Sequence, residues 1–242
     1  MVTLTIDGRE IQAEEGRMLL EVAREHGIEI PALCYHEGLS PYGACRLCMV
    51  EIVTRQGRER LVTSCLYPVA EGLTVRTDSP KIELVRQTAI EFLLARCPDS
   101  EVIRDLAHKL GVDETSFRLE ADKGKCILCA LCTRACEEVV GVSAISLVGR
   151  GGAKEMTTPF SDFSEACIGC GSCAYICPTG AISLRDKGDT RVVKMPHVTM
   201  EFKLKQCARC GKYWAPERQL AYIAKRAGLE LSEFDICPDC RD

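Results

Sequence analysis

The chain of 242 residues is long enough to form two or three small domains. Hydrophobic residues make up 46% of it and charged residues 27%, which is ordinary globular composition. A net charge of −4 gives no indication of a nucleic acid or an anionic membrane as a partner. Because the sequence has no run of about 18 apolar residues and begins without the pattern of a signal peptide, we expect a soluble, cytoplasmic protein with no membrane partner.

The first 78 residues carry the pattern of a small β-grasp domain. Residues 2–6 and 9–13 alternate as strands on either side of Asp7-Gly8, which is a strong hairpin signal. A helical pattern follows and ends at Gly27. Further strands are predicted at 49–53, 60–64 and 73–77.

The sequence contains 17 cysteines, and in a reducing compartment such a count favours metal binding over disulfides. All but Cys97 divide into four quartets of recognisable spacing. The quartets are Cys34, Cys45, Cys48 and Cys65; Cys126, Cys129, Cys132 and Cys136; Cys167, Cys170, Cys173 and Cys177; and Cys207, Cys210, Cys237 and Cys240.

The first quartet predicts a [2Fe–2S] site. Its cysteines fall in loops of the predicted β-grasp domain, and two of them flank Arg46-Leu47. The spacing C-x10-C-x2-C-x16-C departs from the plant-type pattern, but four thiolates around a glycine-containing loop still suit a [2Fe–2S] cluster. A structural zinc site is the alternative, although zinc ligands usually come as two C-x2-C knuckles and this quartet has one.

The second and third quartets are two copies of one unit. Each cysteine of the second quartet has a counterpart 41 residues later, and the segment SAISL at 143–147 is echoed by GAISL at 180–184. The spacing C-x2-C-x2-C-x3-C resembles that of bacterial ferredoxins with two [4Fe–4S] clusters. Zinc or disulfides fit two tandem quartets of this kind poorly.

In such ferredoxins the fourth cysteine of each copy ligates the other cluster. The resemblance therefore implies one site formed by Cys126, Cys129, Cys132 and Cys177. It implies a second site formed by Cys167, Cys170, Cys173 and Cys136. Small residues such as Gly169 and Gly171 would let backbone amides approach the cluster sulfurs, where such donors help to set the reduction potential.

Longer stretches of the sequence resemble a group of three families. All three show, in the same order, segments similar to GIEIPALCYHEGLSPYGACRLCMVEI followed by TSC, and to CILCALCTRACEE followed by CIGCGSCAYICPTGAI. They are the large iron–sulfur subunit of respiratory complex I, the N-terminal region of [FeFe] hydrogenases, and the iron–sulfur diaphorase subunit of NAD-linked bidirectional [NiFe] hydrogenases. The resemblance covers residues 1–190 and implies an iron–sulfur electron-transfer subunit.

Residues 79–122 are predicted to form a helical linker. Ser79-Pro80 marks a helix start, and apolar residues recur on one face of the segment that follows. This face is predicted to comprise Ile82, Val85, Ala89, Phe92 and Leu93. A second helix, ended by Gly111, would carry His108 on its exposed face.

In the resembled families, the segment that corresponds to this linker commonly holds a further cluster. They place an additional [4Fe–4S] site after the first linker helix, with one His and three Cys as ligands. Cys97 is the one cysteine in this segment, and a lone thiolate cannot hold a cubane. We therefore predict that this site has been deleted and that Cys97 is a packed small residue.

Residues 191–242 are predicted to form a small metal domain. Strands at 190–195 and 198–204 follow a loop at 185–189 and precede two C-x2-C knuckles, which are separated by 26 residues. Four thiolates in two knuckles make a tetrahedral site, zinc-ribbon-like if zinc is bound, with mononuclear iron as the alternative. A helix between the knuckles would carry Leu220 and Ile223 on one side. We expect the metal to stabilise this tail and the tail to dock a partner subunit.

The predicted fold class is α+β. Its parts are a β-grasp [2Fe–2S] domain at 1–78, the helical linker at 79–122, a dicluster [4Fe–4S] ferredoxin domain at 123–190 and the zinc-ribbon-like domain at 191–242. The sequence contains neither a G-x-G-x-x-G dinucleotide fingerprint nor a Walker loop, so we expect a non-catalytic subunit.

The resemblance implies that the chain relays single electrons between a flavin subunit that uses NAD(P)(H) and a [NiFe] hydrogenase small subunit. A flavin-bearing partner is needed because clusters carry one electron at a time, whereas nicotinamide exchanges a hydride. Ferredoxin is a further candidate partner. Two alternatives stay open: the same relay in a formate dehydrogenase or a complex I-like assembly, and a free-standing polyferredoxin carrier.

Overall fold

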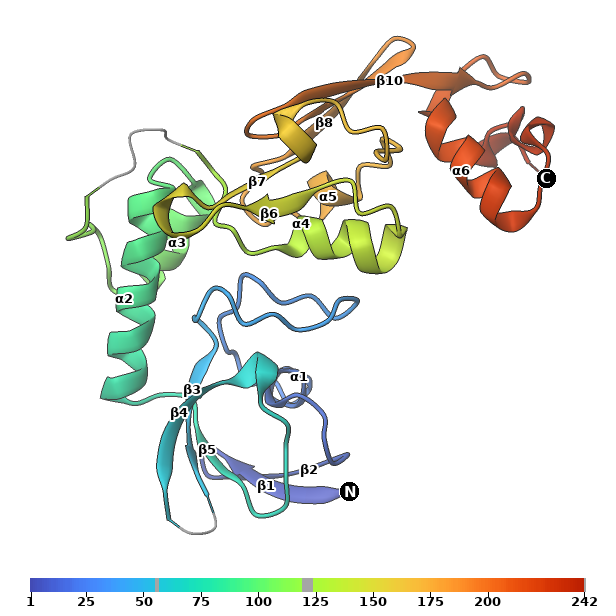
Figure 1. Ribbon diagram of the computed structural model, residues 1–242. Helices are drawn as coiled ribbons and strands as arrows, with labels where there is room; N and C mark the ends of the chain where they lie inside the picture. Colours follow the sequence, from blue (N-terminus) through green and yellow to red (C-terminus); the bar gives the residue numbers. More distant parts are fainter. Residues whose placement is uncertain (55–56, 119–123, 242) are drawn as a thin grey trace. The chain divides into compact units, whose positions relative to one another are not determined.

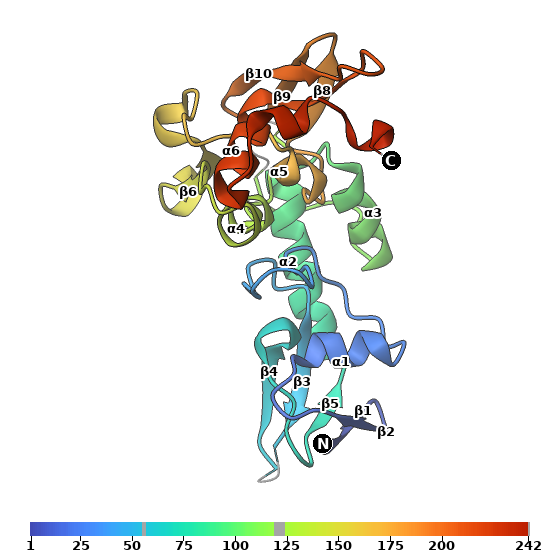
Figure 2. The same ribbon diagram turned by 90° about the vertical axis from the view of Figure 1, so that its right-hand side faces the viewer.

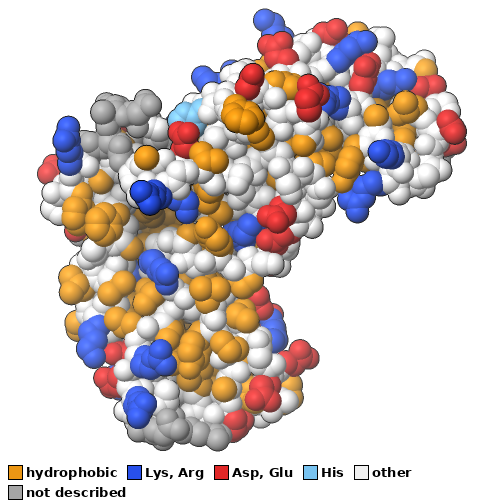
Figure 3. All heavy atoms as spheres, viewed as in Figure 1, with side chains coloured by type: hydrophobic (Ala, Val, Ile, Leu, Met, Phe, Trp, Pro, Cys, Tyr) orange, Lys and Arg blue, Asp and Glu red, His pale blue; other side chains and the backbone are white. Residues whose placement is uncertain are grey.

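The computed structural model describes residues 1–54, 57–118 and 124–241. These residues form two compact units, Met1–Ala130 and Leu131–Asp242, and each is described by itself (Figures 1 and 2). The predicted boundary between linker and dicluster domain, at 122/123, lies outside the described residues. Among the helices of the described part, none is both long and apolar enough to cross a membrane. On the face shown in Figure 3, basic and acidic side chains are interspersed, in keeping with the small net charge.

The first unit is built on a five-stranded mixed sheet with the order β2-β1-β5-β3-β4. Strand β1 pairs antiparallel with β2 and parallel with β5, and β3 pairs antiparallel with both β4 and β5. The strands are β1 Val2–Ile6, β2 Arg9–Ala13, β3 Met49–Val53, β4 Glu59–Thr63 and β5 Thr74–Arg76. All five predicted strands are confirmed, with ends that differ by at most one residue.

The core of this unit lies between the sheet and helix α1 (Leu19–Glu25), which Figure 1 shows against the sheet. Alternate residues of β1 are buried, as expected when one face of a strand meets a helix. The core cluster joins them to the buried face of α1, where Leu20 is fully buried. Asp7 adds a polar tie, since its carboxylate accepts hydrogen bonds from the backbone N (2.7 Å) and Oγ1 (2.6 Å) of Thr77. This tie joins the turn of the hairpin to the residue that follows β5.

Helix α2 (Pro80–Arg96) begins where predicted, because Ser79 Oγ accepts a hydrogen bond from Ile82 N at 3.3 Å. Helix α3 (Glu101–Lys109) follows it, with His108 exposed as predicted. Cys97, at the end of α2, is fully buried, as expected of a packed small residue.

The predicted apolar face of α2 is confirmed only in part, since Val85, Ala89 and Leu93 are partly buried. Of its five residues only Ile82 is buried, and Phe92 is 54% exposed and stacks on the Phe117 ring at 4.2 Å. The buried stripe instead follows the i+4 row through Ile82, Ile90 and Leu94, and the half-buried Arg86 lies in the same row. A charged residue interrupts this row in the sequence, which is why the apolar pattern alone indicates a different face.

The second unit begins with the dicluster region. A short helix α4 (Leu131–Arg134) runs directly into the π-helix η2 (Ala135–Val140), and a small hairpin of β6 (Ser146–Val148) and β7 (Glu155–Thr157) precedes helix α5 (Ser172–Tyr175). Short 3-10 turns lie at Gly151–Ala153 and Pro159–Ser161. In the first unit, a comparable turn, η1, covers Ser64–Leu66.

A four-stranded antiparallel sheet with the order β11-β10-β9-β8 completes the second unit. Its strands are β8 Ser183–Lys187, β9 Thr190–Lys194, β10 Thr199–Gln206 and β11 Tyr213–Pro216. The two strands predicted in this region are confirmed. The predicted loop at 185–189 is corrected, since residues up to Lys187 belong to β8, where Arg185 and Asp186 pair with β9. The sheet also runs across the position 190/191, where the sequence suggests a domain boundary.

Helix α6 (Glu217–Ala227) follows β11 and precedes the 3-10 turns η5 (Leu231–Phe234) and η6 (Pro238–Cys240). Its buried residues are Leu220 and Ala224, which form a small core with Ala215 and Phe234. Ile223, predicted to share the side of Leu220, is 38% exposed, because the second buried position lies at i+4. The helix is thus held between β11, which follows the first knuckle, and η5, which precedes the second.

We predict that Leu20→Ala in α1 destabilises the first unit by about 2–5 kcal/mol, because the side chain is fully buried and its loss leaves a cavity. The matched control is Leu84→Ala in α2, whose side chain is 64% exposed and whose truncation should change stability by less than about 0.5 kcal/mol. Hydrogen exchange of the β1 and β5 amides, read by mass spectrometry, measures the local stability of this unit. Equal exchange in the two variants would contradict the placement of the core.

Candidate metal centres

The first quartet is buried in the loops of the N-terminal sheet. All four thiols are at most 8% exposed. Cys48 and Cys65 have their Sγ atoms 3.3 Å apart, and Cys45 N donates to Cys34 Sγ at 3.4 Å. The thiols thus fall into two pairs, an arrangement that suits the two metal ions of a [2Fe–2S] cluster.

The close contact with Cys65 lowers the pKa of the Cys48 thiol to about 6, and the same contact raises the pKa of Cys65. The sulfurs of Cys48 and Cys65 therefore favour the state in which one of them is a thiolate and the other a thiol. Metal ligands must be thiolates, so the lowered pKa of Cys48 favours its binding to a metal ion.

The loop that carries Cys45 and Cys48 is held by a side chain from α2. Arg86 Nε donates to Leu47 O at 3.1 Å, and its Nη2 donates to Met49 O at 2.9 Å. Ser64, beside Cys65, binds Cys48 O through both its backbone N (3.0 Å) and its Oγ (2.8 Å). These bonds hold the segments that carry Cys48 and Cys65 against each other.

The two central repeats share a backbone conformation. Leu128 and Ala130 in the first copy have φ angles of 54° and 60°, and Gly169 and Gly171 at the equivalent positions of the second copy have 70° and 84°. Left-handed backbone at both sites lets the loop curl tightly between the cysteines. Glycine adopts it without strain, whereas Leu128 and Ala130 adopt it at a cost of roughly 1–2 kcal/mol each.

The echoed SAISL and GAISL segments contact the fourth cysteine of each copy. Ala144 N donates to Cys136 Sγ, and Ala181 N donates to Cys177 Sγ, both at 3.2 Å. The spacing differs, eight residues against four, because Cys136 lies near the start of the π-helix η2 in the first copy. The repeat in the sequence therefore preserves an amide donor to sulfur, which is a group that tunes a bound cluster.

One cavity of the second unit is lined by Cys136, Cys167, Cys170 and Cys173. The remainder of its lining is mostly apolar and includes Ile145, Ile168, Val193 and Met195. Burial raises the pKa of the Cys173 thiol to about 12. Four convergent thiols in an apolar cavity fit a [4Fe–4S] cluster, and they are the crossed set that the ferredoxin spacing implies.

The companion set, Cys126, Cys129, Cys132 and Cys177, stays a prediction. Cys126 and Cys129 end the first unit, and Cys132 and Cys177 belong to the second. Within the first unit, Arg96 Nε donates to Cys126 O at 3.0 Å, so this loop too is held by a side chain from α2.

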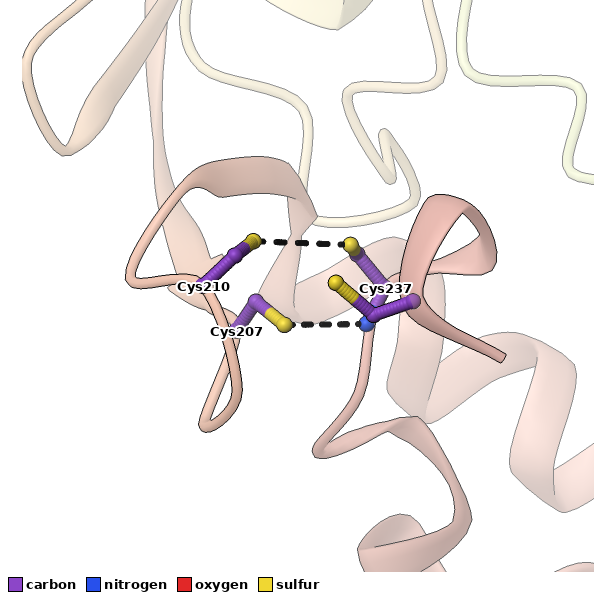
Figure 4. Close-up of side chains that lie close together, drawn as sticks. Cys207, Cys210 and Cys237 are labelled. Carbon is purple, nitrogen blue, oxygen red and sulfur yellow. Dashed lines mark hydrogen bonds between the residues drawn. The ribbon is translucent and has the colours of Figure 1, made fainter. Parts of the chain in front are cut away.

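The C-terminal quartet is already assembled. The Sγ atoms of Cys207, Cys210, Cys237 and Cys240 all lie within 4.8 Å of one another. Figure 4 shows Cys207 and Cys210 on one loop facing Cys237 across a small gap. Cys210 Sγ lies 3.8 Å from Cys237 Sγ, and Cys237 N donates to Cys207 Sγ at 3.3 Å. Backbone amide donors, first that of Cys237, lower the pKa of the Cys207 thiol to about 6.

Polar contacts join the two knuckles around these sulfurs. Arg209 Nη1 donates to Cys240 O at 2.8 Å, and Lys212 Nζ lies 3.1 Å from Asp239 Oδ2. Ala208 N donates to Asp235 O at 2.8 Å. The quartet therefore fits a single ion bound by four thiolates.

Two family models match the chain. A 2Fe-2S iron-sulfur cluster binding domain matches residues 1–80, and a 4Fe-4S dicluster domain matches residues 125–181 and 166–212. A crystal structure of an NAD+-reducing [NiFe]-hydrogenase in the H2-reduced state is 31% identical, with a TM-score of 0.57. That match covers 65% of this chain and 74% of the hydrogenase chain.

The chain belongs to the family of iron–sulfur electron-transfer subunits found in NAD(P)-linked hydrogenases and complex I-like oxidoreductases. Among its curated relatives, a subunit of the NADH-quinone oxidoreductase of Rhizobium meliloti (strain 1021) is 34% identical over 207 residues. The alpha subunit of NADPH-Fe(3+) oxidoreductase from Geobacter sulfurreducens (strain DL-1 / KN400) is 34% identical over 205 residues. Each match covers 75% of this iron–sulfur protein and 24% of the relative, so the chain spans about a quarter of their length.

The residues that hold the ligand loops of this iron–sulfur protein are not evident from its sequence. Arg86 and Arg96 have the pattern of exposed charges on an amphipathic helix, and the roles of Arg218 and Tyr222 in α6 have no local signal. Each contacts a backbone carbonyl or a carboxylate more than 20 residues away along the chain. The one local signal is the position of Arg86, a charged residue within the otherwise apolar row of Ile82, Ile90 and Leu94.

We predict that Cys207→Ser removes one metal ion per chain, because a serine hydroxyl is a poor substitute for a thiolate in a four-sulfur site. Cys97→Ala is the control: it removes a buried thiol outside the quartets and should leave the metal content unchanged. Elemental analysis of the two anaerobically purified variants measures the difference. Loss of metal from the Cys97 variant would show that this thiol is a ligand.

Proposed function

We propose that this protein relays single electrons between a flavin subunit, which exchanges hydride with NAD(P)(H), and a [NiFe] hydrogenase module. The observation that carries the proposal is the likeness to the chain of an NAD+-reducing [NiFe]-hydrogenase, at 31% identity and 74% coverage of that chain. The cytoplasm is the location we infer for such a complex, because free thiols in this number require reducing conditions.

The cofactors in this proposal are one [2Fe–2S] and two [4Fe–4S] clusters, which supply one-electron transfer when bound. The ligand sets are those given above: the first quartet, Cys126, Cys129 and Cys132 with Cys177, and Cys167, Cys170 and Cys173 with Cys136. The chain contributes thiolates, amide donors such as Ala144 N, and an apolar lining that excludes water. Those contributions tune and protect a redox centre but supply no acid, base or nucleophile for bond-making chemistry.

For the C-terminal quartet we propose zinc in a zinc-ribbon-like domain, with mononuclear iron as the alternative. Two C-x2-C knuckles whose sulfurs converge favour tetrahedral coordination, and structural zinc sites use this ligand set. We propose the division into a β-grasp domain at 1–78, a linker at 79–122 that lacks the His-ligated site, a dicluster domain at 123–190 and a metal domain at 191–242, the last two sharing the sheet of β8 to β11.

A second function has support from the relatives. The Rhizobium meliloti relative is named as a subunit of an NADH-quinone oxidoreductase. We therefore keep the same relay within a complex I-like assembly, or within a formate dehydrogenase, as the alternative. The free-standing carrier is the third possibility. The three differ in what accompanies the chain when it is purified from its own cells.

The cofactor content is testable by metal analysis and EPR of the anaerobically purified chain after dithionite reduction. We expect about ten Fe and one Zn per chain, with one [2Fe–2S] signal and two interacting [4Fe–4S] signals. About fourteen Fe would contradict the predicted loss of the His-ligated site. About eleven Fe without zinc would make the C-terminal centre an iron site.

The relay itself is testable in the native complex carrying a tagged copy of this chain. We expect a flavin subunit and a hydrogenase module to copurify, and NADH or NADPH to reduce the [4Fe–4S] signals. In a Cys48→Ser variant, which breaks the [2Fe–2S] ligand set, dithionite should still reduce those signals while the nicotinamide no longer does. Purification of the chain without any flavin subunit would contradict the proposal and favour the free carrier.

A further inference from the structure

We propose that helix α6 and strand β10 of the C-terminal region form a clamp on their own chain, which holds both segments that supply thiolates to the site of Cys136, Cys167, Cys170 and Cys173. The inference rests on the proposed assignment of those four cysteines as ligands of one [4Fe–4S] cluster. It assigns the C-terminal metal domain a role in cluster retention.

The first contact of the clamp is made by Tyr222. Its hydroxyl donates to Val140 O at 2.8 Å, and Val140 ends the π-helix that contains Cys136. Arg226 Nη1 donates to the same hydroxyl oxygen at 2.9 Å, which leaves the Tyr222 proton directed to the carbonyl. Gly141 makes room for this approach, because a Cβ atom there would lie 3.1 Å from Arg226 Nη1 and 3.3 Å from the Tyr222 oxygen.

The second contact is made by Arg218, one helical turn earlier. Its guanidinium donates to the backbone carbonyl of Glu165, lies 2.9 Å from the Glu165 carboxylate, and sits over the Phe163 ring at 5.2 Å. Glu165 is two residues before Cys167, and Cys167 N donates to Ser164 O at 2.9 Å. Residues four apart share a helix face, so one face of α6 contacts both ligand segments.

Strand β10 and its neighbour β9 cover the loop that carries Cys167 and Cys170. Phe202 of β10 packs directly on Gly169, where an added Cβ would lie 2.6 Å from the ring, and its ring centroid is 5.7 Å from that of Phe163. Val193 and Met195 from the β9 side line the cysteine cavity itself. The sheet therefore closes the site with apolar side chains and leaves little room for water.

The C-terminal cysteine quartet lies in the segments that pack on the other side of α6. Its first knuckle lies between β10 and β11, its second follows η5, and the core of Leu220, Ala224, Ala215 and Phe234 lies in the segment between. An ion bound by all four thiolates joins the two chain segments on which the helix packs. Metal binding there should thus favour the position of Arg218 and Tyr222.

Docking of a partner subunit is the other role for this tail. The face of α6 that carries Arg218 and Tyr222 is already occupied by residues 140–141 and 163–165 of the same chain. A partner would have to use a different face, so the two roles can be separated by substituting only the side chains that point inward.

The test uses the full chain with its clusters, purified anaerobically, in a double variant Arg218→Gln and Tyr222→Phe, which removes the guanidinium and the hydroxyl that make the two contacts. The control is Lys225→Gln with Tyr175→Phe, which alters exposed side chains, one on α6 and one at the end of α5. The readouts are the rate of iron release to a chelator, the EPR signals of the reduced clusters, and hydrogen exchange over residues 137–143 and 163–168.

We expect the double variant to release four of about ten iron atoms about tenfold faster than the control, with the [2Fe–2S] signal unchanged. Exchange over the two ligand segments should rise in the same variant. A Cys240→Ser variant should produce the same acceleration by loosening α6 from outside.

Equal iron release and equal exchange in the double variant and the control would overturn the clamp, while the wild-type cluster signals would still stand. If the wild-type chain instead lacks [4Fe–4S] signals after reduction, the proposed ligand assignment fails first, and the clamp fails with it. If the Cys240→Ser variant loses its metal and its copurifying subunits without any faster iron release, the tail is a partner-docking element and the clamp is wrong.

Discussion

A loop that wraps a metal cluster must point its backbone amides toward the sulfurs, and this leaves its carbonyls pointing outward, where they need donors. The structure meets this need repeatedly with long side chains from neighbouring elements. Arg86 binds Leu47 O and Met49 O at the first quartet, and Arg96 binds Cys126 O. Without such donors, the outward carbonyls of a buried loop would cost about 1–3 kcal/mol each.

The second unit follows the same rule. Arg191 Nη1 donates to Gly169 O at 3.4 Å, and its own position is set by a two-point ion pair with Asp186. Tyr222 and Arg218 do the same for Val140 and Glu165. Most of these donors are guanidinium groups, so the same bonds also place positive charge next to sites whose four thiolates carry negative charge. The same guanidinium groups thus hold the loop and would offset the negative charge of a bound cluster.

Local features of this protein can be predicted well from its sequence. The predicted bounds of β1, β2 and β3 match the structure to the residue, since alternation of apolar side chains is a property of a few neighbouring residues. The start of α2 follows from Ser79 and Pro80 for the same reason. The buried face of α2 is not predictable, because Arg86 belongs to it for a hydrogen bond to a loop 37–39 residues away. The predicted loop after β8 is wrong because pairing with β9, and not composition, makes Arg185 and Asp186 a strand.

The sequence by itself determined the chemistry of this protein. Thiolate identity, the spacing between cysteines and the repeated SAISL and GAISL segments are short-range properties, and they are enough to divide sixteen thiols into four quartets. Only the tertiary structure decided what holds those loops. The Tyr222 contact with Val140 joins residues 82 positions apart, and the Arg218 contact with Glu165 joins residues 53 apart. Nothing in the neighbourhood of either residue specifies its partner, because such contacts exist only once the sheet of β8 to β11 has brought α6 to the ligand loops.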